Sequence, residues 1–494
     1  MKKILLCISL FYTLCLPQAQ AADTDAARLV AKMKGQTPIF TDLKQLADEI
    51  GGRPTGSSAN AKAVLWAEQK FKDIGVNVTV EPFDMPRFWL ENQSSATVTG
   101  PDVRFTPRVV AMPFSTGTDN AGLKAPLLNG GTGAEADIAR LGTAAKGAWV
   151  LIQTPVLDDA AGLNGLFREY MDAIDIEQRL EEARVAGLIY MSSRRHNLLY
   201  RHLSSKGAAN KLPILVMERE EAQRAQRLLQ GGKALSFSAR INVEDGPTFT
   251  AYNVIGEIKG ASHPEEIVLI GAHLDSFDLG TGALDNGSNV SMVIDIARQI
   301  TALGLKPRRT IRFALWNGEE QGLYGSFGYT KRHAAELDHH VMATSYDMGT
   351  GKISGFFLNG RDEFLPALNN VLEPVADLGP FTHINHPVVG TDNFDFMMQG
   401  VANLVAAQDS ANYASNYHAQ SDTFDKVNQA QLKLNSAIAA AVTFGLADRE
   451  DISWERYTAE KVKYLVDSTD LPRQMKAFGI WQDWLDNKRG IKHD

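Results

Sequence analysis

Residues 267–289 read IVLIGAHLDSFDLGTGALDNGSN. The first six residues form an apolar run that is typical of a strand in the core of a sheet. The run ends next to His273, and the loop that follows carries Asp275, Asp278 and Asp285 among several glycines. In open α/β sheets, ligand chemistry collects at the carboxyl ends of the strands. The stretch therefore predicts a core strand that delivers a histidine and carboxylates to a functional edge.

The segment from Tyr252 onward alternates strand, loop and helix. Predicted strands occupy 267–272, 310–316 and 341–346, and predicted helices occupy 290–302, 323–335 and 429–446. This order predicts an α/β fold with a mostly parallel or mixed sheet flanked by helices on both faces.

The segment 119–244 has a different character and is interpreted as an inserted domain. It holds short predicted strands at 148–153, 187–191 and 212–217, with helical stretches at 175–185 and 220–229. It contains no cluster of histidine and acidic residues. The remaining divisions are a signal peptide (1–21), an N-terminal part of the catalytic domain (22–118), the catalytic domain itself (245–450) and a C-terminal helical tail (451–494).

The N-terminus has the pattern of a cleaved secretory signal. Met1-Lys2-Lys3 is followed by the apolar run 4–16 and by Ala19-Gln20-Ala21, which are the basic, apolar and cleavage regions of such a signal. The run is too short for a membrane anchor, which needs roughly 20 apolar residues. A secreted or periplasmic protein is expected. Because Cys7 and Cys15 both lie in this signal, the mature chain would have no thiol ligands and no disulfides.

Composition excludes several classes of partner. The chain has 50 basic and 58 acidic side chains, a net charge of −8, whereas nucleic-acid binding favours a basic surface. No later segment is apolar enough to span a bilayer. We therefore expect neither a nucleic-acid partner nor a membrane anchor after signal cleavage.

Polar residues follow each predicted strand of the catalytic domain. His273, Asp275 and Asp285 follow the first strand, Glu319 and Glu320 the second, and Asp347 the third. Carboxylates packed this closely repel one another unless a cation neutralises them. Imidazole and carboxylate ligands without thiolate suit zinc, manganese or cobalt. Asp285, in mid-loop, is well placed to bridge two ions.

Two further roles follow from the chemistry of a hydrolytic metal site. A water activated by metal needs a general base that does not itself bind metal. Adjacent residues point in different directions, so one of Glu319 and Glu320 can be a ligand and the other the base. A ligand histidine usually donates its second N–H to a neighbouring group, and Asp275 could accept it from His273.

The order HLD…D, EE, D and a late H resembles the co-catalytic di-zinc exopeptidases, which include leucyl aminopeptidases and glutamate carboxypeptidases. The resemblance is strongest to their carboxypeptidase Q-like members and covers nearly the whole mature chain. It is carried by residues 51–78, 251–260, 265–289, 317–326 (NGEEQGLYGS) and 417–428 (YHAQSDTFDKVN). The segments KGAWVLIQTP (146–155) and EARVAGLIYMSS (182–193) resemble a protease-associated domain.

The resemblance assigns the metal ligands and the cofactor. It implies two Zn²⁺ per chain, with Co²⁺ or Mn²⁺ as other candidate metals. His273, Asp285 and Asp347 would hold one ion, and Asp285, Glu320 and His418 the other. It also implies a cis peptide bond between the bridging aspartate and Asn286.

The resemblance also assigns catalytic roles. Glu319 would be the general base, Asp275 the partner of His273, and Tyr417 a hydrogen-bond donor to the oxyanion. Asp392 lies in a loop that faces substrate in relatives, although it could instead cap the helix 393–399.

The implied function is hydrolysis of dipeptides or short peptides by an exopeptidase, with a metal-activated hydroxide as nucleophile and a homodimer as one expected form. Two alternatives stay open. One is another amide hydrolase or a cyclase on the same fold, and the other is a non-catalytic binding protein. The sequence does not decide which end of the peptide is removed.

Overall fold

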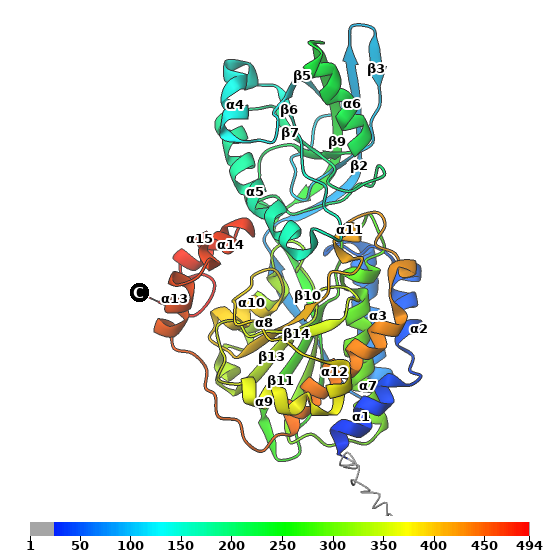
Figure 1. The fold of residues 1–494 in the computed structure, drawn as a ribbon, viewed down its shortest axis with the longest axis vertical. Coiled ribbons are helices and arrows are strands. Elements are labelled where there is room, and N and C mark those ends of the chain that lie inside the picture. The colour runs from blue at the N-terminus through cyan, green and yellow to red at the C-terminus, as the bar shows by residue number, and fades with distance from the viewer. Residues whose placement is uncertain (1–23, 494) are drawn as a thin grey trace, which may run out of the picture.

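The computed structural model describes residues 24–493, so the predicted signal peptide lies outside the described residues. Two mixed sheets flanked by helices form two lobes (Figure 1). The larger lobe holds residues 24–85 and 249–493, and the second lobe is built from the residues between them. The predicted α/β class with a mixed, helix-flanked sheet is therefore confirmed.

The main sheet has seven strands in the order β1-β10-β12-β11-β13-β15-β14. Its four central strands β12, β11, β13 and β15 are parallel, and the strands outside them run antiparallel to their neighbours. The bounds are β1 Asn77–Met85, β10 Phe249–Ile258, β11 His263–His273, β12 Arg309–Trp316, β13 His340–Ser345, β14 Ile353–Phe357 and β15 Asn403–Gln408.

Helices cover both faces of the main sheet because the side chains of its strands alternate between two cores. Val268 and Ile270 of β11 pack into the larger core, whereas Leu269 packs into a smaller one with Trp316. The larger core lies under α1 Asp25–Lys34, α2 Ile39–Lys44, α3 Ser58–Asp73, α7 Ser288–Ala302, α9 Leu365–Val371 and α12 Gln429–Asp448. The smaller core lies under α8 Tyr324–Arg332 and α10 Asn393–Met398.

The second sheet has eight strands in the order β3-β2-β9-β5-β6-β7-β8-β4. The chain enters it directly after β1 and returns to the main sheet at β10. Its strands are β2 Phe88–Gly100, β3 Val103–Phe105, β4 Val109–Ala111, β5 Leu123–Asn129, β6 Trp149–Ile152, β7 Gly187–Met191, β8 Ile214–Met217 and β9 Leu235–Gly246. This sheet thus takes in 88–118, which the expected division at 119 assigns to the catalytic domain.

The helices of the second lobe are α4 Glu135–Leu141, α5 Gly162–Glu182 and α6 Arg219–Gln230. Helix α5 descends from this lobe to the junction with the main sheet, where it packs against α14 Leu471–Ala477 (Figure 1). Beside α14 lie α13 Ala459–Asp467 and α15 Trp481–Leu485, and α11 Tyr413–Asn416 also contacts α5. None of the helices between residues 24 and 493 has the length and apolar character needed to cross a membrane.

Candidate metal centre

Three neighbouring parallel strands bring the predicted site residues to one edge of the main sheet. In the register of these strands, His273 at the end of β11 lies opposite Trp316 at the end of β12. Gly271 lies opposite Ser345 at the end of β13. The loops after β12 and β13 therefore place Glu319, Glu320 and Asp347 beside His273, as the sequence predicts.

The structure gathers the predicted ligands into two buried sets. In the first, His273 Nε2 lies 2.8 Å from Asp347 Oδ1 and 3.0 Å from Asp285 Oδ1. In the second, His418 Nε2 lies 3.0 Å from Glu320 Oε2 and 3.2 Å from Asp285 Oδ2. Ligand atoms around a tetrahedral zinc are about 3.3 Å apart. Each set therefore has ligand spacing suited to one zinc ion, and Asp285 offers one oxygen to each.

The shared carboxylate is fixed by its backbone. The Asp285–Asn286 peptide bond is cis, which confirms that expectation. The buried carboxylate of Asp422 accepts the N–H groups of Leu284 at 2.6 Å and of Asp285 at 3.1 Å. Asn286 Nδ2 donates to the carbonyl of Tyr346 at 2.9 Å. Main chain on both sides of Asp285 is thus held, and its two oxygens face the two histidines.

The electrostatics of the site call for cations. Burial raises the pKa of Glu320 well above its usual range, and the neighbouring Asp285 adds to this effect. Burial also raises the pKa of Asp347. Asp285 Oδ2 and Glu320 Oε1 are buried without hydrogen-bond partners. Unpaired buried carboxylate oxygens are costly, so a pair of bound zinc ions fits these residues.

The two histidines are oriented by different parts of the molecule. His273 Nδ1 donates to the main-chain carbonyl of Asp275 at 2.9 Å, and the Asp275 carboxylate lies farther away, at 3.7 Å. The expected partner residue is therefore present, but its carbonyl makes the closer contact. His418 Nδ1 donates to the carbonyl of Arg201 at 2.8 Å, and Arg201 belongs to the second lobe.

The other predicted site residues lie around the two sets. Glu319 belongs to neither set, and its Oε2 lies 4.0 Å from His273 Nε2. Burial raises the pKa of Glu319 well above its usual range. The Tyr417 hydroxyl lies 3.1 Å from that of Tyr170 on α5. Asp392 occupies the N-cap position of α10, but its side chain makes no capping hydrogen bond, and both of its oxygens are buried without a partner.

A small cavity of about 50 Å³ lies directly above the ligands. Aliphatic and aromatic side chains form much of its wall, including Leu166 and Phe167 of α5, Val388 and Phe478. Among the described residues that line it there is no lysine or arginine. The cavity has room for a few water molecules in this conformation.

Some residues that support the site were missed by the sequence reasoning. The buried Arg53 donates to the carbonyls of Leu274, Thr281 and Gly282, and thereby ties the loop after β11 together. Thr55 Oγ1 donates to Asp275 Oδ2 at 2.9 Å and accepts the N–H of Gly318 at 2.7 Å. Both residues lie in the GGRPT segment (51–55), whose glycines and proline were the available signal.

Comparisons with known proteins agree with this geometry. Residues 253–443 match the model of peptidase family M28. The chain is 28% identical to carboxypeptidase Q of Bos taurus over 426 residues, covering 85% of this chain and 87% of that protein. It is 26% identical to aminopeptidase YwaD of Bacillus subtilis (strain 168), with 71% of each chain covered.

Solved structures show the same architecture. A peptidase M28 precursor from Shewanella amazonensis SB2B superposes with a TM-score of 0.77 at 28% identity, over 88% of this chain and 98% of that one. A zinc aminopeptidase from Bacillus subtilis shares the fold with a TM-score of 0.64 at 22% identity, over 84% and 96% of the two chains. From the family model matched by residues 253–443, these relatives and the two sets of ligands, we conclude that the protein is a metallo-exopeptidase whose residues 253–443 are similar to peptidase family M28.

Proposed function

We propose that the protein holds two zinc ions and hydrolyses the terminal peptide bond of short peptides. The observation that carries this proposal is the pair of ligand sets that share Asp285. His273 and Asp347 would complete one zinc site, and Glu320 and His418 the other. When bound, two such ions lower the pKa of water and polarise a peptide carbonyl.

Residues outside the two sets supply the proton transfer and the charge stabilisation. Glu319 takes a proton from the attacking water and gives it to the leaving amine, which is the role of a general base that then acts as an acid. The Tyr417 hydroxyl donates a hydrogen bond to the oxyanion that develops on the carbonyl. Asp392 is buried without partners next to Thr391, which lines the cavity above the ligands, and we assign it a contact with the substrate.

The cavity above the ligands favours the amino end of the peptide. Beyond the residues that would hold zinc, its wall carries the carboxylate of Glu319 and, among the described residues, no lysine or arginine. A free ammonium group can pair with this carboxylate, whereas a free carboxylate finds no basic side chain on the wall. The apolar side chains around it suit an uncharged terminal residue. We therefore propose removal of an uncharged N-terminal residue.

A panel of blocked peptides tests this proposal. Leu-Gly-Gly should be hydrolysed by the zinc-loaded enzyme, and N-acetylation should abolish its hydrolysis while C-amidation should not. Zinc chelation should stop the reaction and added zinc restore it. Hydrolysis of the N-acetylated peptide but not of the C-amidated one would reverse the assigned end. Cyclisation of an N-terminal glutamine, or peptide binding without turnover, would instead favour the cyclase or the binding protein.

We also propose that the protein is exported, on the basis of the signal pattern in residues 1–21. N-terminal sequencing of protein from the periplasm or medium should find a chain that starts at or near Ala22. Recovery of protein that retains Met1 would contradict export by signal cleavage.

A further inference from the structure

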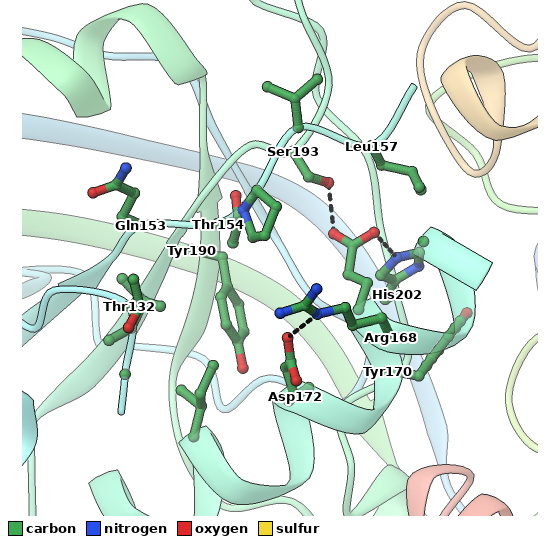
Figure 2. Close-up of a pocket in the computed structure, with 18 of the residues that line it drawn as sticks. Thr132, Gln153, Thr154, Leu157, Arg168, Tyr170, Asp172, Tyr190, Ser193 and His202 are labelled. Carbon is green, nitrogen blue, oxygen red and sulfur yellow. Dashed lines mark hydrogen bonds and ion pairs between the residues drawn. The ribbon is translucent and has the colours of Figure 1, made fainter. Parts of the chain in front are cut away.

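A second, larger cavity of about 590 Å³ lies in the second lobe, between α5 and the segments that follow β6 and β7. Figure 2 shows Thr132 and Gln153 at one end and Tyr170 and His202 at the other. Gln153 is exposed, whereas Tyr170 and His202 are buried. The cavity therefore leads inward from solvent, and its volume falls in the range of small-molecule sites.

The inner end of this cavity adjoins the metal centre. Tyr170 lines both the large cavity and the 50 Å³ cavity above the ligands, and it is the one described residue that the two share. Its hydroxyl is hydrogen-bonded to the hydroxyl of Tyr417, which lines the cavity above the ligands. One aromatic side chain thus separates a space too small for a peptide from a space large enough for several residues.

Helix α5 serves both spaces through its two faces. Leu166, Phe167 and Tyr170 line the cavity at the metal centre. Arg168, Glu169, Asp172, Ala173 and Ile176 line the large cavity. The 3.6-residue period of the helix accounts for this division, since residues three or four apart share a face.

The charges on the wall of the large cavity leave one cation unmatched. Arg168 pairs with Asp172, Arg179 with Asp175, and Glu169 with His202. Arg219 also lines the cavity, and within the described residues it makes no ion pair. Its guanidinium donates to the main-chain carbonyls of Thr154 and Ser192. A carboxylate entering the cavity would therefore find an available positive charge.

We propose that the large cavity binds the part of a short peptide that lies beyond the scissile bond, with its free carboxylate facing Arg219. Tyr170 is then the movable partition between this part and the N-terminal residue at the metal centre. The inference rests on the proposed exopeptidase function and adds a length limit of a few residues and a preference for a free C-terminus. The ligand class is short peptides with an uncharged N-terminal residue.

A series of substrates of increasing length tests the cavity. We would measure kcat/KM for leucinamide, Leu-Gly and Leu-Gly-Gly-Gly with wild-type enzyme and with Ala173→Trp, which places a bulky side chain in the cavity. Overfilling of this kind should lower kcat/KM for the tetrapeptide about tenfold or more, with a loss that grows with substrate length. The matched control is Gln178→Trp, an exposed position of α5 outside the cavity wall.

The charge is tested separately. Arg219→Gln should raise KM for Leu-Gly-Gly-Gly about 10- to 100-fold, the value of a charged hydrogen bond, and leave KM for its C-amide nearly unchanged. Arg219→Lys should recover part of the loss. Equal effects on the free and amidated peptides, or an Ala173→Trp loss that does not depend on length, would overturn the assignment of the cavity. A wild-type enzyme that hydrolyses none of these substrates with zinc bound would overturn the proposed function itself.

Discussion

The two histidines of the metal centre belong to similar sets of ligands, but different parts of the molecule hold them in position. His273 is oriented from within its own loop, by the carbonyl of Asp275 two residues later. His418 is oriented by the carbonyl of Arg201, which comes from the other lobe. The loop around His418 is held in the same way, because Arg194 donates to the carbonyl of Tyr417 at 2.8 Å and Arg201 N donates to that of His418. One of the two proposed zinc sites is thus built by a single lobe, and the other depends on both lobes.

The largest effect is expected from the residue that the two sites share. Asp285→Ala removes a ligand from both sets, so zinc content should fall from about two ions per chain to near zero, with loss of activity. Elemental analysis of the purified variant measures this. Asp377→Ala is the control, because Asp377 is an exposed carboxylate that pairs with Lys34 and belongs to neither ligand set. Two ions retained by Asp285→Ala would contradict the shared ligand.

Substitutions of the adjacent Glu319 and Glu320 should separate zinc binding from catalysis. Glu319→Gln changes a residue outside both ligand sets, so it should keep two zinc ions while kcat falls about 10²- to 10⁴-fold. Glu320→Gln should lose the ion held with His418. Zinc content measured together with kcat shows which glutamate is the base and which the ligand. An inactive Glu319→Gln variant that has lost an ion would mean that Glu319 is the ligand and Glu320 the base.

The support from the second lobe can be removed without touching a ligand. Arg194→Ala should weaken binding of the zinc held by His418 about 10- to 100-fold, as expected for loss of groups that orient a ligand, and leave the other site nearly intact. Zinc titration followed by calorimetry resolves the two affinities. Arg195→Ala is the matched control, because Arg195 is an exposed neighbour that pairs with Asp158. Equal weakening of both sites would mean that the lobes do not divide the centre in this way.

The smallest effect is expected on the side of His273. Thr55→Val removes the hydrogen bonds from Thr55 to Asp275 and from Gly318 to Thr55, each worth about 0.5–1.5 kcal/mol. Zinc stoichiometry should stay at two, while the free energy of unfolding falls by about 1–3 kcal/mol. Denaturant unfolding of the zinc-loaded protein provides the measurement. Loss of zinc from this variant would show that His273 also depends on distant support.

The sequence predicted the strands that carry the ligands because their apolar runs are local signals. Predicted 267–272, 310–316 and 341–346 fall within or one residue beyond β11, β12 and β13. The strands β2, β3, β4, β5 and β9 of the second sheet were missed. Strand β2 has an irregular exposed and half-buried pattern along most of its length, so it lacks the alternation that marks a strand.

For the site too, local signals could be read from the sequence and long-range contacts could not. The ligand residues lie in short motifs, and the structure brings all of them together. Helix α5 begins at Gly162, earlier than the predicted 175, because its start has no side-chain cap to signal it. The support of His418 by Arg194 and Arg201 joins residues more than 200 positions apart, and no pattern in one sequence reveals such a pair.

The carbonyl of Arg201 that orients His418 also sets the order in which the lobes and the metal centre can form. Arg201 lies 217 residues before His418, and the chain completes the second lobe and then β10 to β15 before His418 is reached. In the proposed di-zinc enzyme, the site at His418 would therefore reach its final geometry only after the two lobes have docked. A partly folded or proteolytically nicked chain would then lack this zinc and stay inactive until the second lobe is in place.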